Sequence, residues 1–144
     1  MLLRHIGIVC KEDINNLEKF YSKLFHPVNV HKCIEKGEKL KLITGVDNIK
    51  LITCKIQTKN FMIELIQYID PKPLNIPKKS PAFTGLNHFA LTVKESAEFL
   101  DLVEKYGGKL IGNGAKDLNE NVRSAIYVSD PEGNIIEVVE ESMW

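Results

Sequence analysis

The chain has 144 residues, of which 44% are hydrophobic and 26% are charged, the balance of a soluble globular protein with one sizeable core. Its 19 basic and 19 acidic side chains cancel, which argues against nucleic acid or an anionic membrane as a partner. The N-terminus is too soon charged for a signal peptide, and no window has the length of a membrane span. Three widely spaced cysteines fit no metal or redox motif and favour free thiols. We therefore expect a cytoplasmic protein.

The first half begins with a predicted strand over residues 4–12, RHIGIVCKE. A helix is predicted next, because apolar residues recur at helical spacing from Ile14 to Leu24, with Asp13 as its N-cap. Strand-like runs follow, broken by turn residues: VNVHKCI, KLKLITG, KLITCKIQT and FMIELIQY. The first two of these runs form either one bent strand or two strands.

Residues 71–85 are predicted to be a linker, because four of the six prolines lie between positions 70 and 85. The linker separates residues 1–70 from residues 86–144. Each half is small for an independent domain. We therefore expect one domain over residues 1–144, in which the two halves share a core.

The second half repeats the order of the first. A strand, NHFALTVKE, precedes a helix that contains Phe99 and Tyr106, with Ser96 as the candidate N-cap and Gly107–Gly108 at its end. The runs KLIG, VRSAIYV and NIIEVVEE are predicted strands, and residues 130–134 form the last hairpin turn. Both halves thus read as a strand, a helix and about three strands.

Superposing the two halves aligns two pairs of residues. The first strands match His5 with His88 at an offset of 83, and the last strands match Glu64 with Glu137 at an offset of 73. The offset changes because the first half has about ten more residues between its helix and its last strand. Strand alternation places each histidine on the face with the smaller residues, while the bulkier face can pack on the helix.

Glu64 interrupts the apolar run FMIELIQY, and an unpartnered buried carboxylate costs on the order of several kcal/mol. Its side chain therefore either faces solvent or meets a positive charge. Two histidines and two glutamates suit a divalent ion such as Zn²⁺, Ni²⁺, Co²⁺, Fe²⁺ or Mn²⁺, with positions left open for substrate. Each residue alone would more often be a surface or core residue. Their matched positions predict one metal site formed by His5, Glu64, His88 and Glu137.

Four segments together resemble the vicinal oxygen chelate superfamily, and its glyoxalase I-like members most closely. They are RHIGIVCKEDINNLEKFYSKLF, TGVDNIKLITCKIQTKNFMIELIQYIDP, GLNHFALTV and YVSDPEGNIIEVVEE. The resemblance implies an α+β fold in which two βαβββ modules form a curled, mostly antiparallel sheet around a central divalent metal. It also implies a homodimer whose sites combine one module from each subunit.

The activity implied is that of a metal-dependent lyase or isomerase of the glyoxalase I (lactoylglutathione lyase) type. Such an enzyme moves a proton next to metal-bound vicinal oxygens of a small substrate. By position, Glu137 would be both ligand and base, with Glu64 as the alternative base. Arg123 and Tyr68 are candidate substrate contacts, although a surface role is the more ordinary one for Arg123.

Other members of the superfamily remain alternatives. They are a methylmalonyl-CoA epimerase-like isomerase, an extradiol dioxygenase, a thiol transferase that inactivates fosfomycin, and a metal-free protein that sequesters drugs. A dioxygenase would use two histidines and one glutamate around Fe²⁺, which would leave Glu64 as a surplus ligand. Metal content separates the binding protein from the enzymes.

Overall fold

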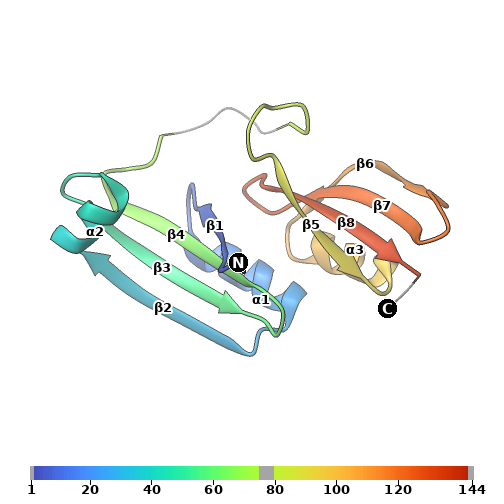
Figure 1. The fold of residues 1–144 in the computed structure, drawn as a ribbon, viewed down its shortest axis with the longest axis horizontal. Coiled ribbons are helices and arrows are strands. Elements are labelled where there is room, and N and C mark those ends of the chain that lie inside the picture. The colour runs from blue at the N-terminus through green and yellow to red at the C-terminus, as the bar shows by residue number, and fades with distance from the viewer. Residues whose placement is uncertain (1, 75–79, 143–144) are drawn as a thin grey trace. The chain divides into compact units, whose positions relative to one another are not determined.

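The computed structural model describes residues 2–74 and 80–142, and the chain divides into two compact units, Met1–Asn75 and Ile76–Trp144. Each unit is built on a four-stranded mixed sheet, and the two sheets have the same topology: the first strand of the unit pairs with its fourth, the fourth with the third, and the third with the second. The predicted α+β class with two similar modules is confirmed. Figure 1 shows the strands of both sheets. A core shared by the two modules stays a prediction.

The first module runs from the N-terminus to the end of its fourth strand. Its elements are β1 (Ile6–Val9), α1 (Ile14–Phe25), β2 (Asn29–Lys36), α2 (Glu38–Thr44), β3 (Lys50–Gln57) and β4 (Met62–Asp70). Helix α1 begins where predicted, because the Asp13 side chain accepts a hydrogen bond from the backbone N–H of Asn15 at 2.9 Å. Its apolar stripe is buried: Ile14, Leu17, Phe20, Tyr21 and Leu24. The helix packs on β3 and β4.

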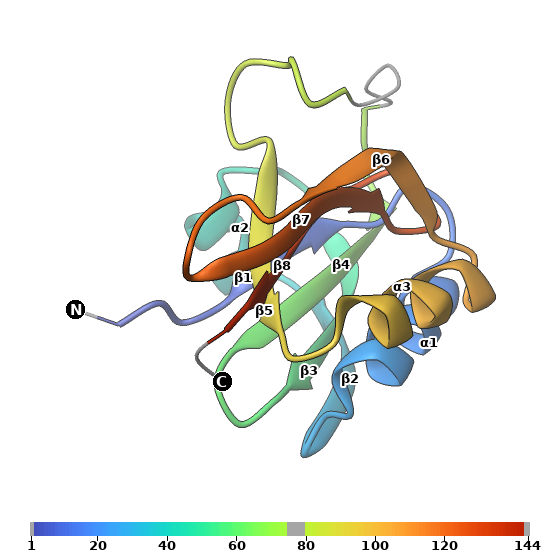
Figure 2. The ribbon, with the colours of Figure 1, turned by 90° about the vertical axis from the view of Figure 1, so that its right-hand side faces the viewer.

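The second module repeats this plan with less burial. Its elements are β5 (His88–Val93), α3 (Ser96–Lys105), β6 (Lys109–Lys116), β7 (Val122–Ser129) and β8 (Ile135–Glu141). Helix α3, labelled in Figure 2, packs on β6 and β8. Only Val103 of this helix is fully buried. The predicted hairpin turn is confirmed, since the backbone N–H of Asp130 donates to the Asn134 carbonyl at 2.9 Å.

Two local predictions are wrong. The run KLKLITG lies in α2 instead of a strand. Its alternating Lys and Leu imitate a strand, but Gly37 and Gly45 adopt positive φ on either side and the Gly45 N–H closes the helix on the Lys41 carbonyl at 2.7 Å. Helix α2 has no counterpart among residues 80–142, and it lies among the extra residues of the first half. In α3, Ser96 is the first helical residue and Glu95 is the N-cap.

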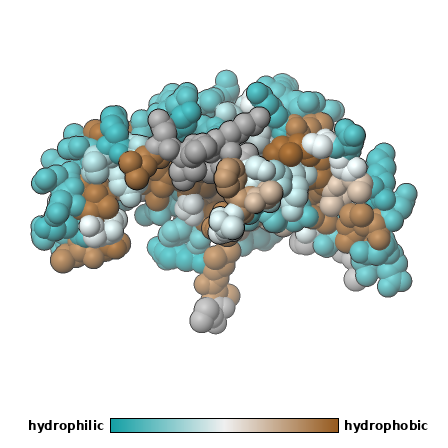
Figure 3. Space-filling view, turned by 90° about the horizontal axis from the view of Figure 1, so that it is seen from above, coloured by the Kyte–Doolittle hydropathy of each residue, from teal (hydrophilic) through white to brown (hydrophobic). Residues whose placement is uncertain are grey.

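Helix α2 buries none of its side chains, and Leu42 and Ile43 are largely exposed. The view in Figure 3 shows such apolar groups as brown patches on a mostly hydrophilic surface. Part of the predicted linker, residues 75–79, lies outside the described residues. Its remaining residues, 71–74 and 80–85, contain no helix or strand.

Candidate metal centre

The first module brings His5 and Glu64 together. His5 precedes β1, and β1 runs parallel to β4 in a register that pairs Gly7 with Glu64. The Nε2 atom of His5 lies 3.2 Å from Oε2 of Glu64. Ile63 and Leu65, the neighbours of Glu64 along β4, are fully buried, so strand alternation directs Glu64 away from the core with helix α1. The glutamate side chain is 14% exposed.

Lys55 is a positively charged partner for Glu64, the carboxylate that interrupts the apolar run of β4. Its Nζ atom lies 3.4 Å from Oε1 of Glu64, so the two carboxylate oxygens face a lysine and a histidine respectively. Antiparallel pairing of β3 with β4 sets Lys55 directly across from Glu64. The Thr58 hydroxyl fixes this register in the turn, where it donates to the Phe61 carbonyl at 2.8 Å. Sequence reasoning missed Lys55, although counting outward from the turn would have found it.

The second module repeats the histidine–glutamate contact. The Nε2 atom of His88 lies 3.3 Å from Oε2 of Glu137, and parallel pairing of β5 with β8 sets Ala90 beside Glu137. Tyr127 stands across the sheet from Glu137 and packs on the His88 ring, with 4.9 Å between ring centroids. Tyr127 therefore takes the place that Lys55 holds in the first module. Glu137 is 30% exposed, about twice as much as Glu64.

The outer nitrogens of the two histidines differ in their surroundings. Nδ1 of His88 lies 3.2 Å from Oδ1 of Asn87, the kind of partner that orients a metal-binding imidazole. Nδ1 of His5 is buried and has no hydrogen-bond partner among the described residues. The His88 ring therefore has an orienting partner that the described residues do not provide for the His5 ring.

Each pair fits two ligands of one divalent ion. Ligand atoms at about 2.0–2.2 Å from a metal lie about 2.8–3.1 Å apart at neighbouring octahedral positions and about 3.3–3.6 Å apart in tetrahedral geometry, a combined range of about 2.8–3.6 Å. The observed separations of 3.2 and 3.3 Å fall in this range. Neutral imidazole and carboxylate are ligands that Zn²⁺, Ni²⁺, Co²⁺, Fe²⁺ and Mn²⁺ accept. Within residues 2–74 and 80–142 no group of three or more His, Cys, Asp or Glu side chains is gathered to hold a metal, so each module offers two candidate ligands.

A second pair of residues at matched positions connects the last strand of each module to the start of its helix. Three residues beyond the glutamates, Gln67 and Glu140 accept hydrogen bonds from the first N–H groups of α1 and α3, at 3.1 and 2.9 Å. Hydrogen bonds from Ser96, followed by the Arg123 guanidinium, lower the pKa of the Glu140 carboxyl. These contacts tie the last strand to the helix on one face. The histidine–glutamate pair stays on the other.

The two candidate substrate residues have separate positions. The Arg123 Nη1 atom lies 3.6 Å from Oε1 of Glu140, the carboxylate that caps α3. Tyr68 is half-buried on β4 and pairs with Leu51. By alternation its side chain lies on the Glu64 face of the sheet. Tyr68 therefore lies on the same face of the sheet as Glu64. Arg123 instead contacts the carboxylate of Glu140 at the start of α3.

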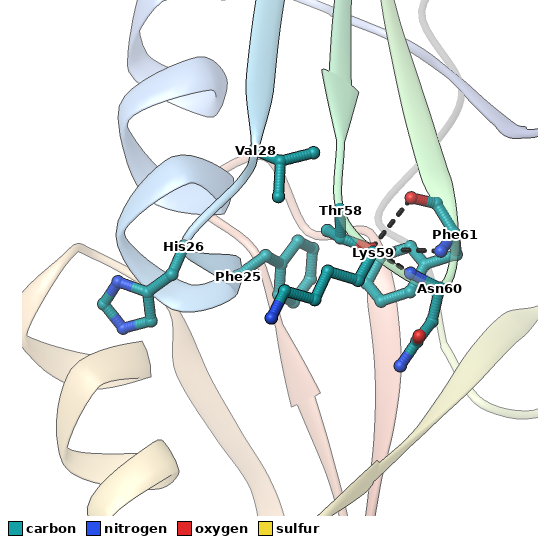
Figure 4. A pocket seen from close by; sticks show the side chains of 7 residues that line it. All are labelled: Phe25, His26, Val28, Thr58, Lys59, Asn60 and Phe61. Atoms are coloured by element: carbon teal, nitrogen blue, oxygen red, sulfur yellow. Dashed lines mark hydrogen bonds between the residues drawn. The ribbon is translucent and has the colours of Figure 1, made fainter.

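None of the three cysteines forms a disulfide, and Cys10 and Cys54 are buried while Cys33 is half-buried. Burial raises the pKa of the Cys54 thiol to about 11, with the Glu18 carboxylate acting in the same direction, which makes that thiol a poor nucleophile at neutral pH. A surface hollow of about 230 Å³ lies at the end of α1 beside the β3–β4 turn. Figure 4 shows the residues that line it, among them Phe25, Lys59 and Phe61. None of its lining residues belongs to either pair.

The sequence profile of the glyoxalase/bleomycin resistance protein/dioxygenase superfamily matches residues 4–127. The chain belongs to this superfamily. The predicted resemblance to vicinal oxygen chelate proteins is thereby confirmed, and the superfamily includes enzymes. No curated protein matches the chain. No helix in the described part of the chain is long and apolar enough to cross a membrane.

Solved structures share the fold at low sequence identity. A glyoxalase family protein from Bacillus cereus is 22% identical with a TM-score of 0.85, over 98% of this chain and 95% of that one. The genomically encoded fosfomycin resistance protein FosX from Listeria monocytogenes is 17% identical with a TM-score of 0.61, over 98% and 94%. A variant of that FosX, in complex with Mn(II) and 1S,2S-dihydroxypropylphosphonic acid, is 17% identical with a TM-score of 0.57, over 98% and 93%.

Proposed function

We propose that this protein is a divalent-metal-dependent lyase or isomerase of the glyoxalase I type, which moves a proton between adjacent carbons of a small oxygenated substrate. The observation that carries the proposal is the repeated histidine–glutamate contact, at 3.2 Å in one module and 3.3 Å in the other. Superfamily membership and the Mn(II) complex of FosX add support.

The proposed ligands are His5 and Glu64 from the first module and His88 and Glu137 from the second. The two pairs would have to meet, either within one chain or between the chains of a homodimer. A divalent ion held there would act as a Lewis acid that stabilises negative charge as it develops on neighbouring substrate oxygens. Its identity among Zn²⁺, Ni²⁺, Co²⁺, Fe²⁺ and Mn²⁺ depends on cellular supply as well as on the ligands.

Glu137 is the proposed base. Lys55 and His5 face the two oxygens of Glu64, whereas within residues 80–142 the ion pair of Glu137 is made by His88 through Oε2 alone. Oε1 of Glu137 is therefore the carboxylate oxygen that is open to receive a proton. The greater exposure of Glu137 supports the same assignment. Glu64 then serves as ligand only.

The test is proton transfer in the metal-loaded protein. We would remove bound metal, reload with each of the five ions in turn, and assay the hemithioacetal of methylglyoxal and glutathione in D₂O, together with methylmalonyl-CoA. Turnover or solvent deuterium incorporation that requires metal, and that Glu137→Gln abolishes, would support the proposal. A panel that is inactive with every ion, in protein shown to bind metal, would contradict the isomerase activity.

One observation favours a second candidate, a metal-free ligand-binding protein. Because Lys55 lies 3.4 Å from Glu64, the charge of Glu64 is compensated without any metal. In that case the protein would bind its ligand equally well after treatment with a chelator. Metal content and metal affinity decide between the two functions.

A further inference from the structure

The residue that stands across the sheet from the glutamate distinguishes the two modules. In the first module, strand pairing lines up His31, Lys55, Glu64 and Gly7 across β2, β3, β4 and β1. In the second module the corresponding row is Ile111, Tyr127, Glu137 and Ala90. Basic side chains therefore flank the glutamate row in the first module and are absent from the equivalent row in the second.

The Lys55 side chain is partly exposed to solvent. Its side chain is 35% exposed, whereas the Glu64 carboxylate that it contacts is 14% exposed. Gly7, next to Glu64 on the other side, has no side chain, and a Cβ atom built there would approach nothing closer than 4.0 Å, at Cδ1 of Ile66. The ammonium group is thus partly exposed beside a largely covered carboxylate, and the position across that carboxylate carries no side chain.

At the proposed site the positive charge of Lys55 is not balanced by the proposed ligands and the ion. Two carboxylates balance a divalent ion when both histidines are neutral, as metal binding requires. Lys55 then adds one positive charge that no acidic side chain of the proposed ligand set compensates. A positive charge near a metal attracts an anionic group most strongly where water is partly excluded.

We propose that Lys55 is a specificity-determining residue that binds an anionic group, of the carboxylate type, on the substrate, next to the oxygens that approach the metal. This inference rests on the proposed function. If a divalent ion were to share the charge of Glu64, the Lys55 ammonium would be left to pair with the anionic group of the substrate. The substrates are accordingly small oxygenated molecules that carry a negative charge, and a neutral analogue binds more weakly.

Matched chelating probes test this inference. Mn²⁺-loaded protein would be titrated calorimetrically with acetohydroxamate and with the monohydroxamates of malonic, succinic and glutaric acid, which carry the same chelating group and an added carboxylate at increasing reach. We expect at least one carboxylate probe to bind the native protein about ten-fold more tightly than acetohydroxamate, which corresponds to a single added charge contact. Lys55→Met should remove that preference and leave acetohydroxamate within about two-fold.

Two further variants complete the test. Lys55→Arg should keep most of the preference, because it retains the charge. Lys59→Met removes an exposed lysine from the turn of the same hairpin and should change neither affinity. The inference is overturned if native protein shows no preference, if Lys55→Met weakens both kinds of probe alike, or if Lys59→Met has the same effect as Lys55→Met. Intact Mn²⁺ binding in such a case would leave the proposed function standing, whereas failure of native protein to bind any metal would overturn both.

Discussion

The two modules share a topology and a histidine–glutamate pair, but they surround that pair differently. In the first module a lysine contacts the glutamate, and Nδ1 of the histidine has no hydrogen-bond partner among residues 2–74 and 80–142. In the second module a tyrosine packs on the histidine, and an asparagine lies beside its outer nitrogen. The repeated fold therefore presents the proposed ligands in duplicate, while the residues around each pair differ between the two halves. In the proposed function, the first half binds an anionic group and the second half exchanges a proton.

The largest expected difference concerns the two glutamates. Glu137→Gln should lower turnover by about a thousand-fold, within the range that a general base contributes, whereas Glu64→Gln should lower it by about ten-fold. Both variants keep an oxygen ligand, so metal content should be measured beside kcat. The opposite ranking, with metal retained in both variants, would make Glu64 the base.

The two helices should differ in their contribution to stability. Leu17 of α1 is fully buried, whereas Leu102 of α3 is half-buried. Leu17→Ala should therefore reduce the free energy of unfolding by about 3 kcal/mol, and Leu102→Ala by less than about half as much. Urea denaturation followed by circular dichroism measures both. Equal losses would indicate that the core of the second module extends further over α3 than the described contacts show.

A smaller effect is expected at the partner of His88. Asn87→Ala should weaken metal binding by about ten-fold, because loss of an orienting partner commonly costs a metal site that much. His5 offers no equivalent partner to remove. Calorimetric titration of the apoprotein with Ni²⁺ or Mn²⁺ measures the change, and Asn60→Ala in the β3–β4 turn provides the control. An unchanged affinity would mean that packing on Tyr127 suffices to hold the ring.

The smallest effect concerns the residues that anchor the helix starts. The pKa of Glu140 is lowered in the folded protein, so its stabilising contribution is complete above the unfolded pKa and is lost as the pH falls through the lower folded value. Gln67 performs the same role without titrating. Replacing Glu140 with Gln should therefore flatten the acid side of the stability–pH profile below about 4.5, whereas Gln67→Ala should lower stability equally at all pH values. Thermal unfolding between pH 3 and 7 tests both, and an unchanged acid limb in the Glu140 variant would contradict the assignment.

The repeat made both histidine–glutamate pairs recognisable from sequence, because the matched first and last strands pair in parallel and bring His5 to Glu64 and His88 to Glu137. That these pairs bind a metal stays a prediction. Lys55 and Tyr127 were missed because cross-strand neighbours follow from hairpin register, which periodicity alone does not give. Helix α2 was misread since alternating Lys and Leu fit a strand, and its short length gives little helical periodicity. Arg123 could not be placed from sequence, because its contact with Glu140 depends on how β7, β8 and the start of α3 meet.

The most direct test of the account is the stoichiometry of metal binding. Apoprotein purified without a metal-affinity tag would be titrated with Mn²⁺, Fe²⁺, Co²⁺, Ni²⁺ and Zn²⁺ beside Glu64→Ala and Glu137→Ala, with folding checked by circular dichroism. We predict one tightly bound ion per chain, whether the pairs meet within a chain or between chains, and a loss of affinity of at least about a hundred-fold in each variant. Two independent ions per chain, a loss in only one of the variants, or folded protein that binds none of the five ions would contradict a single site built from both modules.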